Sequence, residues 1–330
     1  MASFVALLKK SRRLLPLTFR IAAPRATVDL GALADWPAGY FPTNPSIVRV
    51  QDGFLASVRG VNYQLHGSSG IKARFTVGDR FTTVNRFLHL SPAMTVTRRL
   101  RQIEAAFDGV EDIKLFAVGE RIFGTGSRAS SANERSCRIV LGEIAADLSG
   151  ASLRDIASPF GLRQEKNWAP FAHNGDIHFL YSYHPLIVLR FNEATGTVAF
   201  TDDRCKAYSP RALPFLVSGS SPGIEIPGGY LFVAHRRSVR LPTLRRTYLS
   251  RLYHLARDLR TVTGGPYFVI NMPSVQFVSG LMVDDRSAYV AYGQNDCSAR
   301  LADFDPAVFW RLWSERQGRS ARLSLGYTPG

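Results

Sequence analysis

The chain has 330 residues, of which 45% are hydrophobic and 11% aromatic, which is sufficient for a large folded core. Its 41 lysines and arginines outnumber its 26 aspartates and glutamates, giving a formal net charge of +15. Such a charge suits anionic partners, for example phosphorylated sugars, nucleic acid or a membrane surface. There is no run of five basic residues, no zinc-finger spacing and no RNA-recognition signature. We therefore expect no nucleic-acid partner.

The first 35 residues predict a short basic extension ahead of the folded domain. Phe4–Leu8 is apolar and is followed by four basic residues within Lys9–Arg13, which is the reverse of the order in a secretory signal. We expect a solvated tail, with peripheral contact between residues 1–20 and the inner membrane surface as the alternative.

The three cysteines indicate a reducing compartment. Cys137, Cys205 and Cys297 are few, odd in number and far apart, which argues against a disulfide framework. No Cys or His cluster has the spacing of metal ligands. We expect a cytoplasmic protein that uses no metal and no cofactor.

From Asn44 onward, short apolar runs rich in β-branched and aromatic residues alternate with Gly, Asp, Asn and Pro, a pattern typical of strands. Five segments look like variants of one unit in which a turn introduces a central strand, at a spacing of roughly 50 to 70 residues. The predicted central strands are Phe54–Val58, Arg121–Thr125, Ile177–Tyr183, Tyr230–Ala234 and Ser287–Tyr292. The strands predicted before them are Ser46–Val50, Asp112–Val118, Ala169–His173, Gly223–Ile226 and Phe277–Val283.

The remaining elements complete the units. A third strand is predicted at Ile187–Phe191 and at Tyr248–Asp258, although the second of these also fits a helical period. Gly150–Gly161 and Lys206–Ser221 look like loops between units, and Asp305 can cap a helix over residues 307–316. Repeated strand–turn–strand units of this kind predict an all-β fold, a five-bladed β-propeller formed by residues 36–330 as one domain, with a C-terminal helix.

The loops of a propeller converge on one funnel, so polar residues at the same phase of successive units can form a site. The segment Glu165–Phe171, which combines an acid, a base, an amide and two aromatic residues around a proline, is either a rigid corner or part of such a site. The candidates at this phase are Asn44, Arg59, Glu111, Asp112, Arg128, Lys166, Asn167, Tyr183, His235 and Asp296.

In this order the residues resemble glycoside hydrolase family 130, the five-bladed β-propeller mannoside phosphorylases and hydrolases, and the related mannosyltransferase-phosphorylases. The segments that carry the resemblance are Asn44-Pro45-Ser46-Ile47, Arg59, Glu111-Asp112, Lys166-Asn167-Trp168, His235 and Gly293–Asp296. The resemblance implies an enzyme that cleaves or transfers a glycosyl unit, β-mannosyl in this family, by an inverting and phosphorolysis-like reaction. The implied partners are an oligosaccharide or other glycoside, and inorganic phosphate or a sugar phosphate.

The resemblance also assigns roles to residues. Asp112 falls on the proton donor, and Arg59, Lys166 and His235 fall on a cluster that binds the anion. The remaining residues of the implied substrate site are Asn62, Glu111, Asn167, Trp168, Tyr183 and Asp296.

Among these, Asp296 would bind a sugar hydroxyl, and Trp168 or Tyr183 would stack on a sugar face. Asn62 and Asn167 would donate or accept hydrogen bonds.

Two departures from the family pattern keep other functions open. Lys114 stands where the family has an arginine, and Arg236 stands where a glycine follows the histidine. One alternative is a glycosyltransferase of cell-surface polysaccharide synthesis, and another is a propeller that binds glycans or proteins without catalysis.

The residues themselves also allow purely structural roles. Arg59 could form a salt bridge between blades with Glu111 or Asp112, His235 could be a satisfied structural residue, and Asp296 could form an Asx turn.

Overall fold

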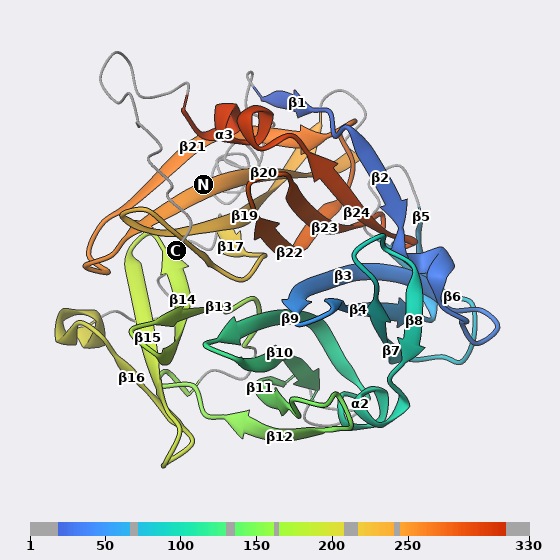
Figure 1. The fold of residues 1–330 in the computed structure, drawn as a ribbon, viewed down its shortest axis with the longest axis horizontal. Helices are drawn as coiled ribbons and strands as arrows, with labels where there is room; N and C mark the ends of the chain where they lie inside the picture. Colours follow the sequence, from blue (N-terminus) through green and yellow to red (C-terminus); the bar gives the residue numbers. More distant parts are fainter. Residues whose placement is uncertain are drawn as a thin grey trace, which may run out of the picture.

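The protein is described here by a computed structural model, which covers residues 19–66, 72–129, 136–161, 165–207, 217–240 and 245–314. Five β-sheets radiate from a common axis in these residues (Figure 1), so the expected all-β, five-bladed propeller is confirmed. The five predicted central strands all form, each as the second strand of its blade.

The blades follow one another along the chain, and each runs from the axis outward. Blade one consists of β3 (Phe41–Val50), β4 (Gly53–Val61), β7 (Thr83–Leu90) and β8 (Val96–Arg99). Blade two consists of β9 (Val110–Val118), β10 (Arg121–Ala129), β11 (Cys137–Ile144) and β12 (Ala151–Ile156). Blade three consists of β13 (Ala169–His173), β14 (Asp176–Tyr183), β15 (Leu186–Asn192) and β16 (Thr197–Phe200). Blade four contains β17 (Val217–Gly219), β18 (Ile224–Ile226), β19 (Gly229–Arg240), β20 (Arg245–Ala256) and β21 (Val262–Ile270). Blade five contains β22 (Gln276–Val283), β23 (Ala288–Gln294) and β24 (Ser298–Phe304).

Two N-terminal strands complete the outer edges of the last blades. β1 (Arg20–Ala22) pairs in parallel with β21, and β2 (Ala26–Asp29) pairs antiparallel with β24 as the outermost strand of blade five. The boundary that we expected near Asp35 is therefore wrong for this segment. Three- and four-residue strands are too short to leave a periodic signal in the sequence.

The strand predicted at Tyr248–Asp258 is confirmed, because most of this segment lies in β20. The segment also fits a helical period because both faces of the strand are covered and its apolar residues are correspondingly frequent. One further expectation is corrected. Gly150–Gly161, expected to be a loop, contains the outer strand β12. The loop expected at Lys206–Ser221 lies partly outside the described residues, and its last part contains β17.

Helices are few and short in the described part of the chain. The predicted C-terminal helix forms as α3 (Pro306–Ser314) and packs against β21, and α2 (Arg101–Ala106) precedes β9. Single 3-10 turns occur at Leu30–Leu33 and Asp203–Ala207. None of these helices is long and apolar enough to cross a membrane.

Apolar clusters between neighbouring blades hold the propeller together. Between blades two and three, for example, Phe116 and Phe123 lie in one buried cluster with Trp168 and Phe179. Burying such side chains stabilises the fold by about 1.5–3 kcal/mol each. Because each blade is fixed to its neighbours, the ends of the innermost strands are held in a defined geometry around the axis.

Candidate functional site

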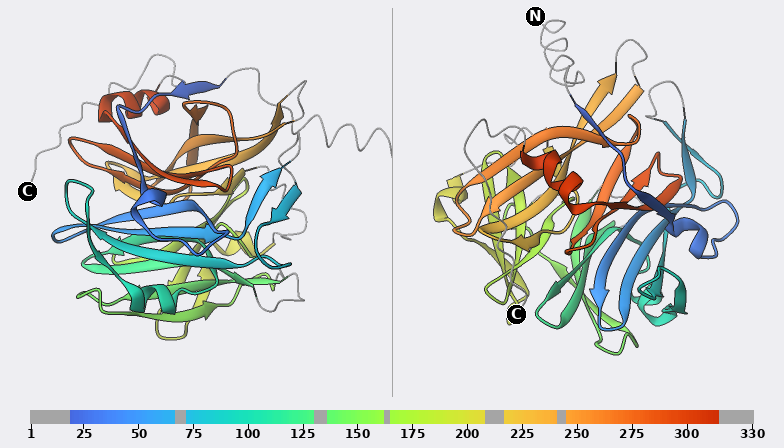
Figure 2. Two further views of the ribbon diagram at one scale, coloured as in Figure 1. Left: turned by 90° about the vertical axis from the view of Figure 1, so that its right-hand side faces the viewer. Right: turned by 45° about the horizontal axis from the view of Figure 1, so that its top comes forward.

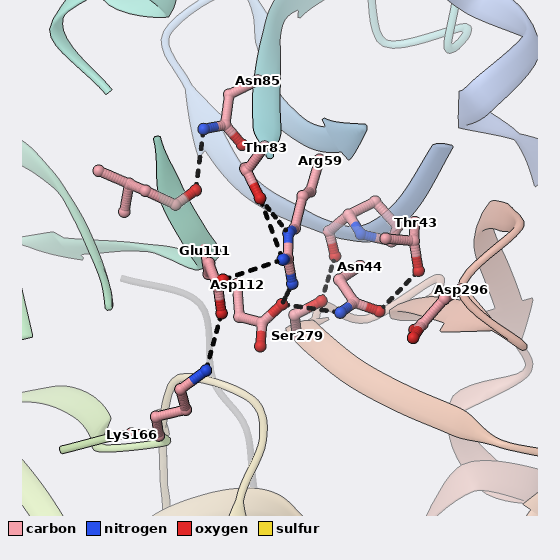
Figure 3. Close-up of polar contacts among 12 residues, drawn as sticks. Thr43, Asn44, Arg59, Thr83, Asn85, Glu111, Asp112, Lys166, Ser279 and Asp296 are labelled. Carbon is pink, nitrogen blue, oxygen red and sulfur yellow. Dashed lines mark hydrogen bonds and ion pairs between the residues drawn. The ribbon is translucent and has the colours of Figure 1, made fainter. Parts of the chain in front are cut away.

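The innermost strands of blades one, two and five each carry a β-bulge, and these bulges bring polar side chains together. The pairing shifts register at Asn44, at Asp112 and at Ser279. A bulge re-aims a side chain away from the regular alternation of a strand. Asn44 Nδ2 donates a hydrogen bond to Asp112 Oδ1 at 2.8 Å, and Ser279 Oγ donates to the Pro45 carbonyl oxygen at 2.8 Å (Figure 3).

The backbone is strained at this end of the propeller. Asp112 has a φ of 54°, Asn44 of 42° and Asn167 of 63°, in a region that non-glycine residues rarely occupy. Gly126 lies opposite the bulge at Asp112, where a Cβ atom would come within 2.5 Å of the Glu111 carbonyl oxygen. Only glycine fits at position 126 without a clash, and this close approach allows the bulge that directs Asp112 towards the axis. Strain of this kind is characteristic of functional sites.

Arg59, at the end of β4, links blade one to the start of β9. It is buried, and its Nη1 donates to Asp112 Oδ1 at 2.7 Å while its Nη2 lies 3.4 Å from Glu111 Oε1. Its Nε and Nη2 also donate to Thr83 Oγ1, at 3.2 and 3.0 Å. The salt bridge between blades that we considered for Arg59 is thus present.

Lys166 extends this network to blade three. Its Nζ donates to Glu111 Oε2 at 2.8 Å, although 48% of its side chain remains exposed. The neighbouring acid, Glu165, is engaged by Trp168, because Glu165 Oε2 accepts a hydrogen bond from Trp168 Nε1 at 3.0 Å. Lys166 consequently joins the central network and leaves its ammonium group accessible.

The carboxyl group of Asp112 is ionised at neutral pH. Burial would raise its pKa, but Arg59, the hydrogen bond from Asn44 and the charges of Lys114 and Lys166 together lower the pKa to about 2. Among the described residues, only Oδ1 is hydrogen-bonded, and Oδ2 points away from Arg59 and Asn44 (Figure 3). One oxygen of the carboxylate is anchored and the other is available.

Lys114, which the family pattern marked only as a departure, is part of the site. Its Nζ is buried, lies 3.5 Å from the Asp112 carbonyl oxygen and sits 5.9 Å from the centre of the Phe277 ring. Burial lowers the pKa of this lysine to about 8. Lys114 and Asn167 line a small crevice together with Glu111 and Asp112.

His235 is buried and adds no positive charge to the network at neutral pH, and its part in the anion cluster stays a prediction. Burial lowers its pKa to about 3, with the charges of Arg237 and Lys114 acting in the same direction. Its Nδ1 lies 2.7 Å from Ser220 Oγ, and its ring stacks on Tyr248 with centroids 4.8 Å apart.

Asp296 lies at the blade-five edge of the same network (Figure 3). Its Oδ2 accepts a hydrogen bond from Tyr63 OH at 3.1 Å, and burial raises its pKa while the charge of Arg59 lowers it. Sequence reasoning missed Tyr63 because this residue follows the predicted strand and lies in an inserted hairpin.

Three predicted site residues are buried. Trp168 and Tyr183 are each only 2% exposed and pack in the cores between blades, so neither exposes a ring face on which a sugar could stack. Trp168 also lines the crevice beside Glu111 and Asp112. Asn62 is buried, and its Nδ2 donates to the carbonyl oxygens of Val77 and Arg80 at 2.7 and 2.8 Å. Both hydrogen atoms of its amide group are therefore used in hydrogen bonds to the backbone and are not available to a sugar.

Arg128, which the sequence placed at the same phase, donates to the Ala106 carbonyl oxygen at 3.3 Å and takes no described part in this network. Within the described ranges, no group of three or more His, Cys, Asp or Glu side chains is placed to hold a metal ion.

No protein-family model matches the sequence, and no curated protein sequence matches it either. Solved structures share its fold. A β-1,2-mannobiose phosphorylase from Listeria innocua superposes with a TM-score of 0.57 at 13% identity, over 85% of this chain and 94% of that one. A GDP-Man-dependent mannosyltransferase from Leishmania mexicana gives 0.56 at 12% identity, over 92% and 94%.

A further structure comes from the GH130 family of mannoside phosphorylases, which contains glycoside hydrolases that target β-1,2-mannosidic linkages in Candida mannan. It superposes with a TM-score of 0.57 at 12% identity, over 89% of this chain and 96% of that one. The resemblance in fold to these five-bladed propellers is therefore confirmed.

Proposed function

We propose that the protein is a carbohydrate-active enzyme that cleaves or transfers a β-mannosyl unit at Asp112. The observation that carries this proposal is the Asp112 carboxylate, which has one oxygen fixed by Arg59 and Asn44 and the other directed away from both (Figure 3). The fold shared with a mannobiose phosphorylase and a mannosyltransferase supports mannosyl chemistry.

An anion beside Lys166 and Arg59 would prepare Asp112 for its role. The ammonium group of Lys166 is accessible, so a phosphate or sugar phosphate can share it with Glu111 through charge-assisted hydrogen bonds. The added negative charge reduces the positive field at Asp112, and the pKa of its carboxyl group rises towards its usual range.

The protonated fraction of the carboxyl group, which grows as its pKa rises, can then act as a general acid. Asp112 gives its proton to the departing sugar oxygen as the glycosidic C–O bond breaks. The phosphate oxygen forms the new bond to the anomeric carbon from the opposite face, which inverts the configuration at that carbon.

The reverse reaction provides the test. Purified protein incubated with mannose 1-phosphate and a panel of sugar acceptors should release inorganic phosphate. Asp112→Asn should lower the initial rate by about 100-fold or more, because general acid–base groups typically contribute that much. Asp155→Asn, which removes an exposed carboxylate paired with Arg138, serves as the control. An unchanged rate in Asp112→Asn would remove Asp112 from this role.

A second candidate is a glycosyltransferase of cell-surface polysaccharide synthesis that uses an activated donor. It is favoured by arginines on the β19–β20 hairpin, where Arg237 is exposed and the charge of Arg246 acts on the carboxyl group of Asp296. Guanidinium groups near the site suit the diphosphate of such a donor. Release of GDP from GDP-mannose in the presence of an acceptor, without turnover of mannose 1-phosphate, would favour this candidate.

A third candidate is a propeller that binds glycans without catalysis, favoured by the closed ion pair between Arg59 and Asp112. Thermal melting separates it from the enzyme, since a ligand that binds the native state raises the melting temperature. Stabilisation by a mannoside that is independent of phosphate indicates a binding module, and stabilisation that requires both ligands indicates the enzyme.

A further inference from the structure

Blade one carries an aromatic cluster on a hairpin inserted between β4 and β7. The hairpin consists of β5 (Tyr63–His66) and β6 (Lys72–Phe75), and Phe81 follows it. The Phe81 ring packs edge-to-face against Tyr63 at 5.0 Å and against Phe75 at 4.9 Å between centroids, yet 61% of Phe81 is exposed. Val77 in the same segment is also exposed, so the segment presents a second apolar side chain to solvent.

Hydrogen bonds to the buried side chain of Asn62 fix the segment that presents Phe81. Asn62 Nδ2 donates to the carbonyl oxygens of Val77 and Arg80, and Asn62 Oδ1 accepts from the Thr82 amide at 2.9 Å. The Thr76 amide in turn donates to the Asn62 carbonyl oxygen at 2.9 Å. The ring is therefore held in place before any ligand arrives, which reduces the entropy lost on binding.

The aromatic cluster is continuous with the central network. Tyr63 packs on Phe81 and donates its hydroxyl hydrogen to Asp296, whose carboxyl group interacts electrostatically with Arg59. The hairpin stands out from one face of the propeller in the left view of Figure 2. A chain molecule bound at Asp112 and Asp296 could extend onto this hairpin.

We propose that Phe81, with Phe75 and Tyr63 behind it, forms a subsite for a pyranose ring of an oligosaccharide whose reacting unit lies at Asp112. This inference rests on the proposed function and specifies its substrate class as an oligosaccharide. The C–H face of a pyranose is apolar and can cover the exposed aromatic ring, while its hydroxyl groups stay in water or reach Asp296.

The test compares β-1,2-linked mannobiose, mannotriose and mannotetraose as substrates for phosphorolysis. For the wild type, kcat/KM should rise from the disaccharide to the longer chains. Phe81→Ala should lower the ratio of kcat/KM for tetraose over biose by about tenfold, equivalent to about 1.4 kcal/mol. Phe81→Trp should retain the ratio, because it keeps an aromatic face.

Val96→Ala is the matched control, since it truncates another exposed apolar residue of blade one. It should change none of the rates. If Phe81→Ala keeps the wild-type ratio, the subsite is overturned while the proposed function stands. If the wild type acts on none of the three mannosides and binds none of them, the proposed function and the subsite both fail.

Discussion

Replacing Arg59 with methionine removes the cation that links blades one and two, and it should destabilise the protein far more than the loss of an ordinary ion pair. Arg59 is buried and contacts the carboxylates of Asp112 and Glu111. Methionine fills a similar volume without charge. Two neighbouring carboxylates are then left partly buried, with Lys166 as their remaining hydrogen-bonded cation.

The magnitude follows from the pKa of Asp112. Its shift from 3.8 to about 2 corresponds to about 2.5 kcal/mol of stability at pH 7. The Asp112 side chain is only 18% exposed, so solvent screening removes little of this. Breaking a buried ion pair by removing one partner typically costs about 3–5 kcal/mol, and we expect Arg59→Met to lower the free energy of unfolding by that amount.

The effect should depend on pH with a definite sign. The folded-state pKa of Asp112 lies below its unfolded value of 3.8, so the stabilisation is present above about pH 4 and is lost as the pH falls through about 2. About half of the Asp112 contribution should remain at pH 3. Urea unfolding followed by tryptophan fluorescence at pH 7 and pH 3 measures the difference between wild type and variant at each pH.

Arg121→Met is the matched control. Arg121 also pairs with two carboxylates, Glu143 and Glu193, each at 2.8 Å, but all three side chains are exposed. Exposed pairs contribute about 0–1 kcal/mol. The double variant Arg59→Met/Asp112→Asn should recover about 2 kcal/mol relative to the sum of the single changes. The reasoning is refuted if Arg59→Met costs no more than Arg121→Met, or if its cost is the same at both pH values.

Three further changes test other parts of the site. Gly126→Ala puts a methyl group 2.5 Å from the Glu111 carbonyl oxygen, so we expect a loss of about 2 kcal/mol by thermal melting, together with slower turnover as the bulge shifts. The pKa of His235 is about 3 in the folded protein and 6.5 for an ordinary histidine. Between these values only the unfolded state takes up the proton, so the free energy of unfolding is highest above pH 6.5 and decreases as the pH falls towards 3. Wild type should therefore lose about 2 kcal/mol of stability through His235 when the pH is lowered from 7.5 to 5, and His235→Gln, which cannot take up the proton, should not. Thermal unfolding of both proteins at the two pH values measures the difference. Lys114→Met should raise the melting temperature at pH 7 and lower activity, because a buried ammonium group is costly; a lower melting temperature would show that this lysine stabilises the fold.

The strands could be predicted because their signal is local. Residues such as Asn174-Gly175, at the turn between β13 and β14, mark hairpins whatever the rest of the chain does, and apolar runs between such turns indicate covered strands. The edge strands β1 and β2 could not be predicted, because their pairing with β21 and β24 joins residues more than 200 positions apart.

The site was only partly predictable for a related reason. Arg59, Asp112 and Lys166 were found because they occupy the same phase of successive units, and a salt bridge from Arg59 to Glu111 or Asp112 was one of the roles considered. The pairing of Lys166 with Glu111 was not predicted. Asn62 was misassigned because it lies three residues from Arg59, and an odd separation along an extended segment turns side chains to opposite sides.

The charges of the central network support the anion site that we propose. Arg59 and Lys166 each contact a carboxylate, whereas the only hydrogen bond described for buried Lys114 is to the carbonyl oxygen of Asp112. Burying an ammonium group costs stability, and the charge of Asp112 offsets only part of this cost, because burial still lowers the pKa of Lys114 to about 8. The positive φ at Asp112 is a further cost. The buried ammonium group and the strained backbone both lie beside the Asp112 carboxylate, and the apolar cores between blades offset the stability that they remove. A phosphate group bound beside Asp112, as proposed, would add negative charge near Lys114, so the buried ammonium group that weakens the free protein would strengthen the bound one.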